Sequence, residues 1–475
     1  MEPVPLTAGD MAAATGGRLI GGDARQAIEG ISIDSRTVGE GDFFIAIRGE
    51  RFDGHQFVPD ALAAGARGVL VETRSAAAGG TGGAGDPGGR GPVIIEVADT
   101  TRALQDIARD VRRRSGARVV AITGSAGKTT TKEIAADFLS AKFRVFRNMG
   151  NLNNHIGLPL SLLELRSRPE VAVVELGMNH PGEIRTLIGV AEPEVRVWTN
   201  VGDAHLGFFA SSDEIADAKA EVLEAARAEH VLVANADDPR IAARIASFAG
   251  RVVTFGIHAR GDVQATRVED RGLDGTAADV RTPAGLVRLE TPLLGAGNLS
   301  NVLAATAVAV HFDVPLREIA ARAAALRPAR RRGELLRLPG GITLIDDSYN
   351  SSPSALQRSL ETVGAASGSA RKVAVLGEML ELGDHAKRLH QDCGRAAAAA
   401  GLNFLIAVGG DPARELAGAA VGAGMPANCV AHVPAKQQAV DVALQRVRPG
   451  DLVLVKGSRG IGLDAVVERL KAEFA

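Results

Sequence analysis

Short hydrophobic runs alternate with helix-like segments through most of the chain. Four runs in the first half are almost uninterrupted, at residues 119–122, 171–176, 195–200 and 231–234. Strands buried on both faces of a parallel sheet have this character, whereas half-exposed strands alternate between apolar and polar residues. A second alternating region begins near Leu326, with runs at 343–345, 373–376, 404–408 and 452–455. The pattern predicts an α/β fold, with functional groups beyond the carboxyl ends of the strands.

The same pattern divides the chain into three expected domains, residues 1–99, 100–326 and 327–475. The first has short strands at 69–71 and 93–95, separated by an insertion at 76–91 with eight glycines and one proline. Such a segment buries too little apolar surface to order itself, so we expect a flexible loop inside the first domain. The second domain opens with a helix that ends at Gly116, and a β-rich stretch at 252–294 interrupts its alternation.

Composition narrows the class of protein. The 475 residues are 46% hydrophobic and 23% charged, with a net charge of −2. This charge gives no electrostatic footprint for nucleic acid, and no apolar run approaches the about 18 residues that a membrane span needs. The beginning of the chain does not resemble a signal peptide, and Cys393 and Cys429 have no metal-binding or redox spacing. We therefore expect a cytoplasmic enzyme without nucleic-acid or membrane partners.

Residues 123–130, Thr-Gly-Ser-Ala-Gly-Lys-Thr-Thr, follow the run at 119–122 and precede a helix-like stretch. Glycines let backbone N–H groups close around phosphate oxygens. In such loops the lysine, here Lys128, reaches the phosphates, and the hydroxyl of Thr129 can hold Mg²⁺. Ile122 stands where the usual first glycine would be, so the loop is a shortened variant. A plain glycine turn is the alternative, but the order of strand, turn, Gly-Lys-Thr and helix favours a bound nucleotide. The expected nucleotide-binding residues here are Gly124, Ser125, Ala126, Gly127, Lys128, Thr129 and Thr130.

Three further residues are candidates for chemistry near this loop. Glu175 ends an apolar strand, where a carboxylate is costly without a cation, so it is either a metal ligand or half of an ion pair. His205 follows the strand at 195–200 at the expected edge of the sheet, although a lone loop histidine is usually no ligand. Lys219 lies on a helix opened by Ser211 with a capping-box pattern, and a helical lysine alone indicates only a solvated face.

Three polar segments complete the candidates. Asn298 either caps the helix that follows it or, with Asn301 one turn later, faces a purine edge. Arg332 lies in a charged run that is either a solvated surface or a nucleotide contact brought in by domain closure. The segments 346–350, Asp-Asp-Ser-Tyr-Asn, and 456–460, Lys-Gly-Ser-Arg-Gly, each follow a predicted strand, and the second offers donors for a carboxylate ligand.

Taken in order, these motifs resemble those of the Mur ligases, which build the peptide stem of bacterial cell-wall precursors. The resemblance extends from about residue 6 to residue 470. Within the family it is strongest to the ligases that add D-alanyl-D-alanine to UDP-N-acetylmuramoyl-tripeptide (UDP-MurNAc-tripeptide). The segments that carry it are Asp34-Ser35-Arg36, residues 151–159 (Asn-Leu-Asn-Asn-His-Ile-Gly-Leu-Pro), residues 175–180 (Glu-Leu-Gly-Met-Asn-His), residues 346–350 and residues 455–459.

The resemblance implies a fold and a set of roles. It implies a small α/β domain for the UDP substrate, a central P-loop domain with a parallel sheet for ATP, and a Rossmann-like C-terminal domain. It also implies two Mg²⁺ ions held by Thr129, Glu175, His205 and, if carbamylated, Lys219; the implied catalytic residues are Lys128, Glu175, His205 and Lys219. The implied ATP contacts outside the loop are Asn298, Asn301, Arg332 and Asp347. The implied substrate contacts are Ser35, Arg36, Asn151, Asn154, Tyr349, Asn350, Lys456, Ser458 and Arg459.

Two departures and three alternatives remain at this point. Gly297 replaces a histidine common before the first asparagine of the adenine motif, and the insertion at 76–91 is foreign to the compact first domain. The alternatives are a sibling ligase that adds one amino acid, a ligase similar to folylpolyglutamate synthase, and a regulatory nucleotide-binding module without ligase chemistry. The Asp-Asp-Ser-Tyr-Asn segment and the asparagine-rich segment 151–154 argue against the first two. We expect a monomer that acts on small molecules.

Overall fold

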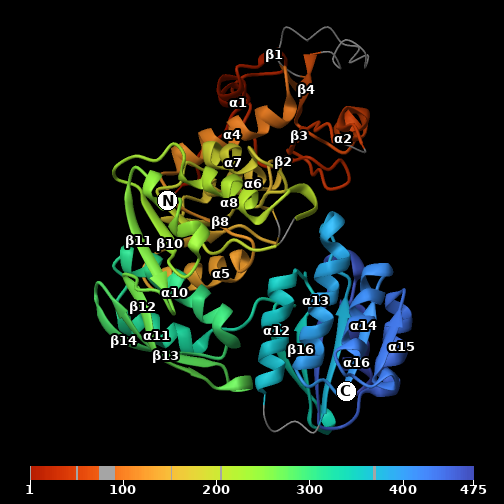
Figure 1. The fold of residues 1–475 in the computed structure, drawn as a ribbon. Coiled ribbons are helices and arrows are strands. Elements are labelled where there is room, and N and C mark those ends of the chain that lie inside the picture. The colour runs from red at the N-terminus through yellow and green to blue at the C-terminus, as the bar shows by residue number, and fades with distance from the viewer. Residues whose placement is uncertain (1, 50–51, 74–90, 151, 204–205, 367–370) are drawn as a thin grey trace. The chain divides into compact units, whose positions relative to one another are not determined.

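The computed structural model describes residues 2–49, 52–73, 91–150, 152–203, 206–366 and 371–475. The chain forms two compact units. The first consists of Met1–Ala121, Phe143–Met178 and Glu183–Glu194, and the second of Ile122–Lys142, Asn179–Gly182 and Val195–Ala475. Both combine strands with covering helices (Figure 1), so the expected α/β class is confirmed.

The first unit begins with a five-stranded sheet in the order β1-β5-β4-β3-β2. Its strands are β1 (Arg18–Gly21), β2 (Ile31–Ser32), β3 (Phe43–Ile45), β4 (Gly68–Glu72) and β5 (Val93–Val97). β1 runs antiparallel to β5, and the other neighbours are parallel. The helices at this sheet are α1 (Ala8–Thr15) and α2 (Val58–Ala63). Phe44, Val58 and Val69 lie in one apolar cluster, which packs α2 against the sheet. Of the insertion at 76–91, all but Gly91 lies outside the described residues.

Helix α4 (Thr100–Ser115) confirms the helix predicted before Gly116. Its N-cap is Asp99, whose side chain accepts a hydrogen bond from the Arg102 N–H, and it ends at Gly116 with φ 71°. A left-handed residue at this place favours glycine because a Cβ is disfavoured there. The rest of the first unit includes β7 (Val145–Arg147), which is parallel to β8 (Val171–Glu175), and the helices α6 (Gly157–Leu163) and α7 (Glu183–Ala191).

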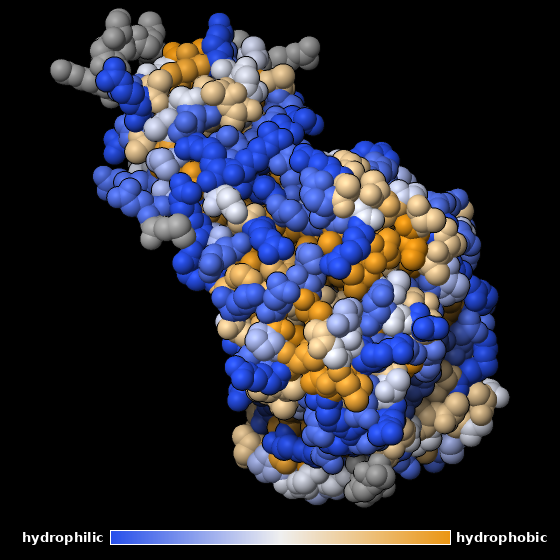
Figure 2. Space-filling view, turned by 90° about the vertical axis from the view of Figure 1, so that its left-hand side faces the viewer, coloured by the Kyte–Doolittle hydropathy of each residue, from blue (hydrophilic) through white to orange (hydrophobic). Residues whose placement is uncertain are grey.

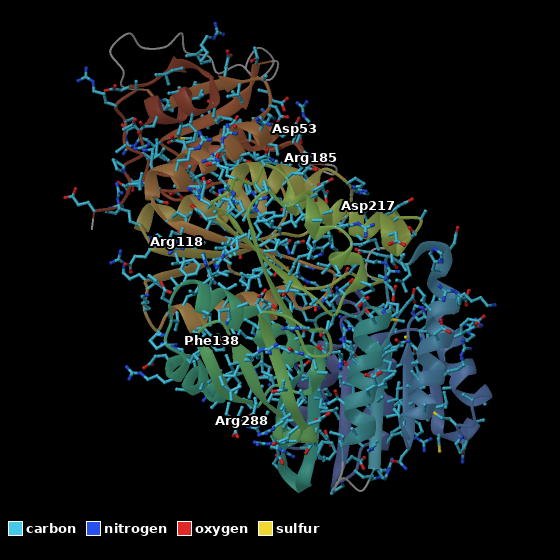
Figure 3. The ribbon with its side chains drawn as sticks, turned by 60° about the vertical axis from the view of Figure 1, so that its left-hand side comes forward. Asp53, Arg118, Phe138, Arg185, Asp217 and Arg288 are labelled. Atoms are coloured by element: carbon cyan, nitrogen blue, oxygen red, sulfur yellow. The ribbon has the colours of Figure 1, made fainter. Side chains whose placement is uncertain are left out.

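The second unit contains a run of strands in the order β14-β13-β12-β11-β10-β9. They are β9 (Val195–Trp198), β10 (Val231–Asn235), β11 (Arg251–Gly256), β12 (Val263–Asp270), β13 (Thr276–Thr282) and β14 (Gly285–Thr291). β9 to β12 are parallel, and β13 and β14 are antiparallel, so the β-rich stretch extends the sheet instead of forming another. Arg288 of β14, labelled in Figure 3, forms ion pairs with Asp279 on the adjacent β13 and with Glu269 on β12, one strand further.

Helices cover this sheet. They are α5 (Lys128–Leu139), α8 (Ser212–Ala220), α9 (Pro239–Ala242), α10 (Gly295–His311) and α11 (Leu316–Ala325). Phe138 of α5, labelled in Figure 3, is fully buried. The long α10 is buried over most of its length, and its residues from Val302 to Ala309 are mostly alanine and valine. Strand β6 (Arg118–Thr123) leads directly into the loop before α5.

The C-terminal part of the second unit is a six-stranded sheet in the order β15-β16-β20-β17-β18-β19. The strands are β15 (Glu334–Leu338), β16 (Ile342–Asp347), β17 (Arg371–Gly377), β18 (Phe404–Val408), β19 (Val430–Val433) and β20 (Asp451–Lys456). Only the edge strand β15 is antiparallel. The helices are α12 (Pro353–Ala365), α13 (Ala386–Ala399), α14 (Asp411–Gly422), α15 (Lys436–Arg446) and α16 (Asp464–Glu473). Val375, Val455 and Val467 share a core between this sheet and α15 and α16.

No helix in the described part of the chain is long and apolar enough to cross a bilayer. Figure 2 shows one face as mostly hydrophilic, with hydrophobic residues in scattered patches. Exposed hydrophobic side chains include Phe52 in the first unit and Leu286 in the second.

Candidate nucleotide and acceptor site

The glycine-rich loop lies between β6 and α5, as predicted. Gly127 is the N-cap of α5 with φ 78°, and Gly124 has φ 152°. A Cβ on Gly124 would lie 2.0 Å from the Thr199 hydroxyl, and one on Gly127 would lie 2.3 Å from Oδ1 of Asn301. Both positions therefore require glycine. The loop lies at the N-terminus of α5, which is where proteins bind phosphate.

Residues at the end of β9 hold this loop in shape, and the sequence analysis did not assign them this role. Asn200 accepts a hydrogen bond from the Ala126 N–H (2.8 Å) and donates one to the Ala126 carbonyl (2.9 Å). Its own carbonyl accepts from the Ser125 N–H at 3.0 Å, and the Thr199 hydroxyl donates to the Ala126 carbonyl at 2.8 Å. The signal was available, because two polar residues directly follow the apolar run of β9.

Two lysines meet at the loop. Lys128 Nζ donates to the Gly124 carbonyl at 2.7 Å. Lys219 lies on α8, whose N-cap Ser211 accepts from the Glu214 N–H, as the capping pattern predicted. The Lys219 side chain is 2% exposed, and burial together with the positive charge of Lys128 holds its pKa well below the usual 10.5. Within the described ranges, which omit His205, Lys219 Nζ has no hydrogen-bond or ion-pair partner. The interpretation of Lys219 as a solvated helix residue is therefore wrong.

The segment after β9 links the loop to the C-terminal sheet. Its start is fixed by Asp238, which accepts from the Val201 N–H at 2.7 Å, and the Gly202 N–H donates to the Ser125 hydroxyl at 2.9 Å. Further on, the Gly207 N–H donates to the carbonyl of Glu381 at 2.7 Å. Gly207 belongs to η3 (Leu206–Phe208), and Glu381 precedes η8 (Gly383–His385). His205 itself lies outside the described residues, so its role as a metal ligand stays a prediction.

Glu175 ends β8 in the first unit and is 4% exposed. The Nδ2 group of Asn153 donates to its Oε1 at 2.8 Å, and the Glu175 N–H donates to Oδ1 of Asn148 at 3.1 Å. Asn148 and Asn153 were not among the predicted site residues; the asparagine-rich segment around them was the only sequence signal. Among the residues described, no group of three or more His, Cys, Asp and Glu side chains is arranged to hold a metal ion.

The two asparagines of α10 differ from their first interpretation. α10 begins at Gly295, and its N-cap Leu294 has no side-chain cap, so Asn298 does not cap the helix. Instead its Nδ2 donates to the Leu294 carbonyl at 2.9 Å, and its Oδ1 accepts from Asn301 at 3.3 Å. Asn301 Oδ1 accepts from the Thr131 hydroxyl at 3.2 Å. Asn301 thus connects α10 to α5, and the adenine contacts of both asparagines remain predictions.

Tyr349 brings together three of the predicted residues in the C-terminal sheet. The guanidinium carbon of Arg332 lies 4.1 Å from the centre of the Tyr349 ring, and that of Arg459 lies 5.7 Å from it. The backbone around them is fixed, since the Gly333 N–H donates to the Asp346 carbonyl at 2.9 Å. Burial raises the pKa of Asp346. Two guanidinium groups on one aromatic ring form a concentrated cationic surface.

Lys456 is already paired in this structure. It is 4% exposed, and its Nζ lies 2.6 Å from Oδ2 of Asp347 and donates to the Asn350 carbonyl at 3.2 Å. The predicted nucleotide contact Asp347 and the predicted acceptor contacts Lys456 and Asn350 therefore form one cluster. The Ser458 hydroxyl accepts from the Leu380 N–H at 2.9 Å and so positions the loop before η8.

The predicted substrate residues of the first unit are on turns. Arg36 is exposed and forms a bidentate pair with Asp34, whose pKa it lowers to about 2. Ser35 lies between them and is half-buried. Asn154 accepts from the N–H of Gly157, the first residue of α6, at 2.8 Å, and Asn151 lies outside the described residues.

Models of one protein family match the chain in three successive parts. "Mur ligase family, catalytic domain" matches residues 27–112, "Mur ligase middle domain" residues 122–309, and "Mur ligase, glutamate ligase domain" residues 331–459. The P-loop, Lys219 and the asparagines of α10 fall in the second match, and the Tyr349 cluster falls in the third.

Individual relatives match over nearly the whole length. The UDP-N-acetylmuramoyl-tripeptide–D-alanyl-D-alanine ligase of Bacillus subtilis is 33% identical over 93% of each chain, and that of Synechocystis is 36% identical over 94% of this chain and 92% of its own. Among solved structures, MurF from Acinetobacter baumannii has a TM-score of 0.86 at 31% identity, covering 99% of this chain and 100% of its own. MurF from Thermotoga maritima in complex with ADP has a TM-score of 0.80 at 29% identity, covering 94% and 98%.

Proposed function

The chain belongs to the Mur ligase family, and we propose that it uses ATP to join D-alanyl-D-alanine to UDP-MurNAc-tripeptide, giving the pentapeptide precursor of peptidoglycan. The observation that carries this function is the full-length match, at more than 30% identity, to enzymes with that named activity. The intact glycine loop and the Tyr349 cluster add the chemistry that such an enzyme needs.

The reaction has two steps. A carboxylate oxygen of the tripeptide attacks the γ-phosphorus of ATP, and ADP leaves with the electron pair of the broken P–O bond. The amine of D-alanyl-D-alanine then attacks the acyl carbon, phosphate departs, and the nitrogen loses a proton. The side chain of Lys128 and the positive N-terminal end of α5 bind and neutralise the phosphate chain, and phosphoryl transfer depends mostly on such positioning and electrostatics.

The donor set suits magnesium. Mg²⁺ prefers hard oxygen ligands, and the Thr129 hydroxyl and the buried carboxylate of Glu175 are of that kind. When bound, the ion would neutralise charge on the transferring phosphoryl group. The lowered pKa of Lys219 favours its neutral amine form, which can attack CO₂ and release a proton to leave an anionic carbamate, a further oxygen ligand. We propose Thr129, Glu175, His205 and carbamylated Lys219 as the groups that hold two ions.

The UDP-sugar peptide and the dipeptide are proposed to bind to different parts of the chain. Ser35, Arg36, Asn151 and Asn154 are proposed to contact the UDP-sugar peptide, and Arg332 and Asp347 the nucleotide. The pocket for the dipeptide is proposed to be lined by Tyr349, Asn350, Lys456, Ser458 and Arg459. Arginine fits a planar carboxylate through paired donors. The proposed domains remain 1–99, 100–326 and 327–475.

The test is ADP release from ATP and Mg²⁺ with UDP-MurNAc-tripeptide, with and without D-alanyl-D-alanine. Release that needs both substrates, with a product heavier by one dipeptide, is the expected result. Release with a single amino acid would identify a sibling ligase, and ADP binding without turnover would identify a non-catalytic module. Lys128→Ala should abolish turnover, whereas Lys387→Ala, which removes an exposed lysine of α13, should not.

A further inference from the structure

An arginine from α12 covers the start of α10. Cδ and Nε of Arg358 both lie 3.3 Å from the point where a Cβ on Gly297 would be. The adjacent turn is close as well, since the Thr362 hydroxyl lies 2.9 Å from the corresponding point on Gly295. The side chain of Arg358 therefore fills the space that a larger residue at position 297 would need.

The guanidinium of Arg358 has no fixed partner. In the described part of the chain it makes no hydrogen bond and no salt bridge, although Glu361, Asp347 and Asp203 act on it electrostatically. Surrounding protein lowers its pKa by desolvation, yet more than a third of the residue remains accessible. A guanidinium that is partly desolvated, accessible and unpaired is available for a ligand, because such a group otherwise finds a carboxylate or a carbonyl.

We propose that Arg358, whose side chain lies over Gly297, binds the adenine base of the nucleotide by stacking its guanidinium plane on that base. This inference rests on the proposed ATP-dependent function. A guanidinium is planar and stacks on π systems, and every base offers a π face for such a contact.

Two observations favour the base over the phosphates as the ligand of Arg358. Asp347 and Asp203 lie close enough to act on Arg358, and they would repel a phosphate chain. The phosphates of the nucleotide are assigned to the glycine loop. Asn301 is hydrogen-bonded both to Thr131 of α5, the helix after that loop, and to Asn298, the residue after Gly297. Because both ends of the Asn298 amide are engaged inside α10, stacking is the larger contact left for a base.

The first experiment measures ADP binding by calorimetry with the full-length protein and no acceptor. Arg358→Ala should weaken ADP binding about tenfold, the scale of one stacked cationic contact. The ADP affinity of Arg358→Lys should lie between those of Arg358→Ala and the original protein. Inorganic triphosphate, which has no base, should bind the variant and the original protein equally. Arg388→Ala is the matched control, because Arg388 is an exposed arginine of α13 paired with Asp392.

A swap tests the position independently. Gly297→His alone should weaken ADP, since its Cβ meets Arg358, and adding Arg358→Ala to it should restore part of the affinity. Equal ADP affinity in Arg358→Ala and the original protein, or an equal loss of triphosphate affinity, overturns the proposal. A lower unfolding temperature of Arg358→Ala with unchanged ADP affinity also overturns it, because Arg358 would then have only a structural role. Product formation is assayed separately, so a failure of the ligase assignment is distinguishable from a failure of this one.

Discussion

Asn200 should control how well the glycine loop binds nucleotide. Its side chain makes two hydrogen bonds to Ala126, at 2.8 and 2.9 Å, while its backbone bond to Ser125 does not depend on the side chain. Each such bond contributes about 0.5–1.5 kcal/mol net. Asn200→Ala therefore costs the loop about 1–3 kcal/mol, and we expect the lower half of that range because Asn200 is half-buried and water can replace it. At about 1.4 kcal/mol per factor of ten, ADP affinity should fall roughly tenfold.

The assay is titration calorimetry with ADP, accompanied by thermal unfolding. Asn200→Asp should be worse than Asn200→Ala, because a carboxylate keeps the acceptor for the Ala126 N–H but opposes the Ala126 carbonyl and the incoming phosphates. The control is Asp99→Ala, which removes the N-cap of α4 and about 1 kcal/mol of stability in the other unit. If Asn200→Ala binds ADP as tightly as the original protein, the loop does not need its side-chain clamp and the reasoning is refuted.

Two further predictions concern buried charges. Lys219→Met should raise the unfolding temperature at pH 7 in CO₂-free buffer. Because the pKa of Lys219 is lower in the folded protein than in the unfolded chain, the unfolded state binds a proton more tightly, and this difference destabilises the folded state. That gain should shrink as the pH rises toward 10.5, and a pH-independent gain would contradict the lowered pKa. Asp347→Asn should destabilise the protein by about 2–4 kcal/mol in urea unfolding, because it leaves the buried Lys456 ammonium without its carboxylate. Lys456→Met should destabilise it less, because the Asp347 carboxylate is 19% exposed. The double variant should lose less than the sum, and strict additivity would show that the pair is not coupled.

The apolar runs predicted the parallel strands well because those strands are buried on both faces. β8, β10, β18 and β20 are fully buried along their length, so their sequences are almost purely hydrophobic. The strands that the pattern missed are short or at edges. β15 (Glu334–Leu338) is an antiparallel edge strand with two charged residues, and β19 is only partly buried, so neither has a continuous apolar signature.

The candidate site divides in the same way. Lys128 and the glycines were predictable, because the loop is a local motif whose spacing has a direct physical meaning. Asn153, Asn200 and Arg358 were not, because each acts on a residue at least 22 positions away and only the fold brings them together. The burial of Lys219 was likewise invisible, since it depends on what packs around α8 and not on the sequence of α8 itself.

The segment after β9 has a thermodynamic consequence. Through Gly202 it is hydrogen-bonded to the nucleotide loop at Ser125, and through Gly207 to the C-terminal sheet's loop at Glu381. Gly207 and Gly383 are in backbone contact there, since a Cβ on either would lie 2.9 Å from the other residue. Any coupling between nucleotide binding and dipeptide binding is a single free energy, which has the same value when measured from either ligand. Whatever factor ATP applies to dipeptide affinity, the dipeptide must apply to ATP affinity, so a mutation at Gly207 that leaves both individual sites intact would appear as lost cooperativity alone.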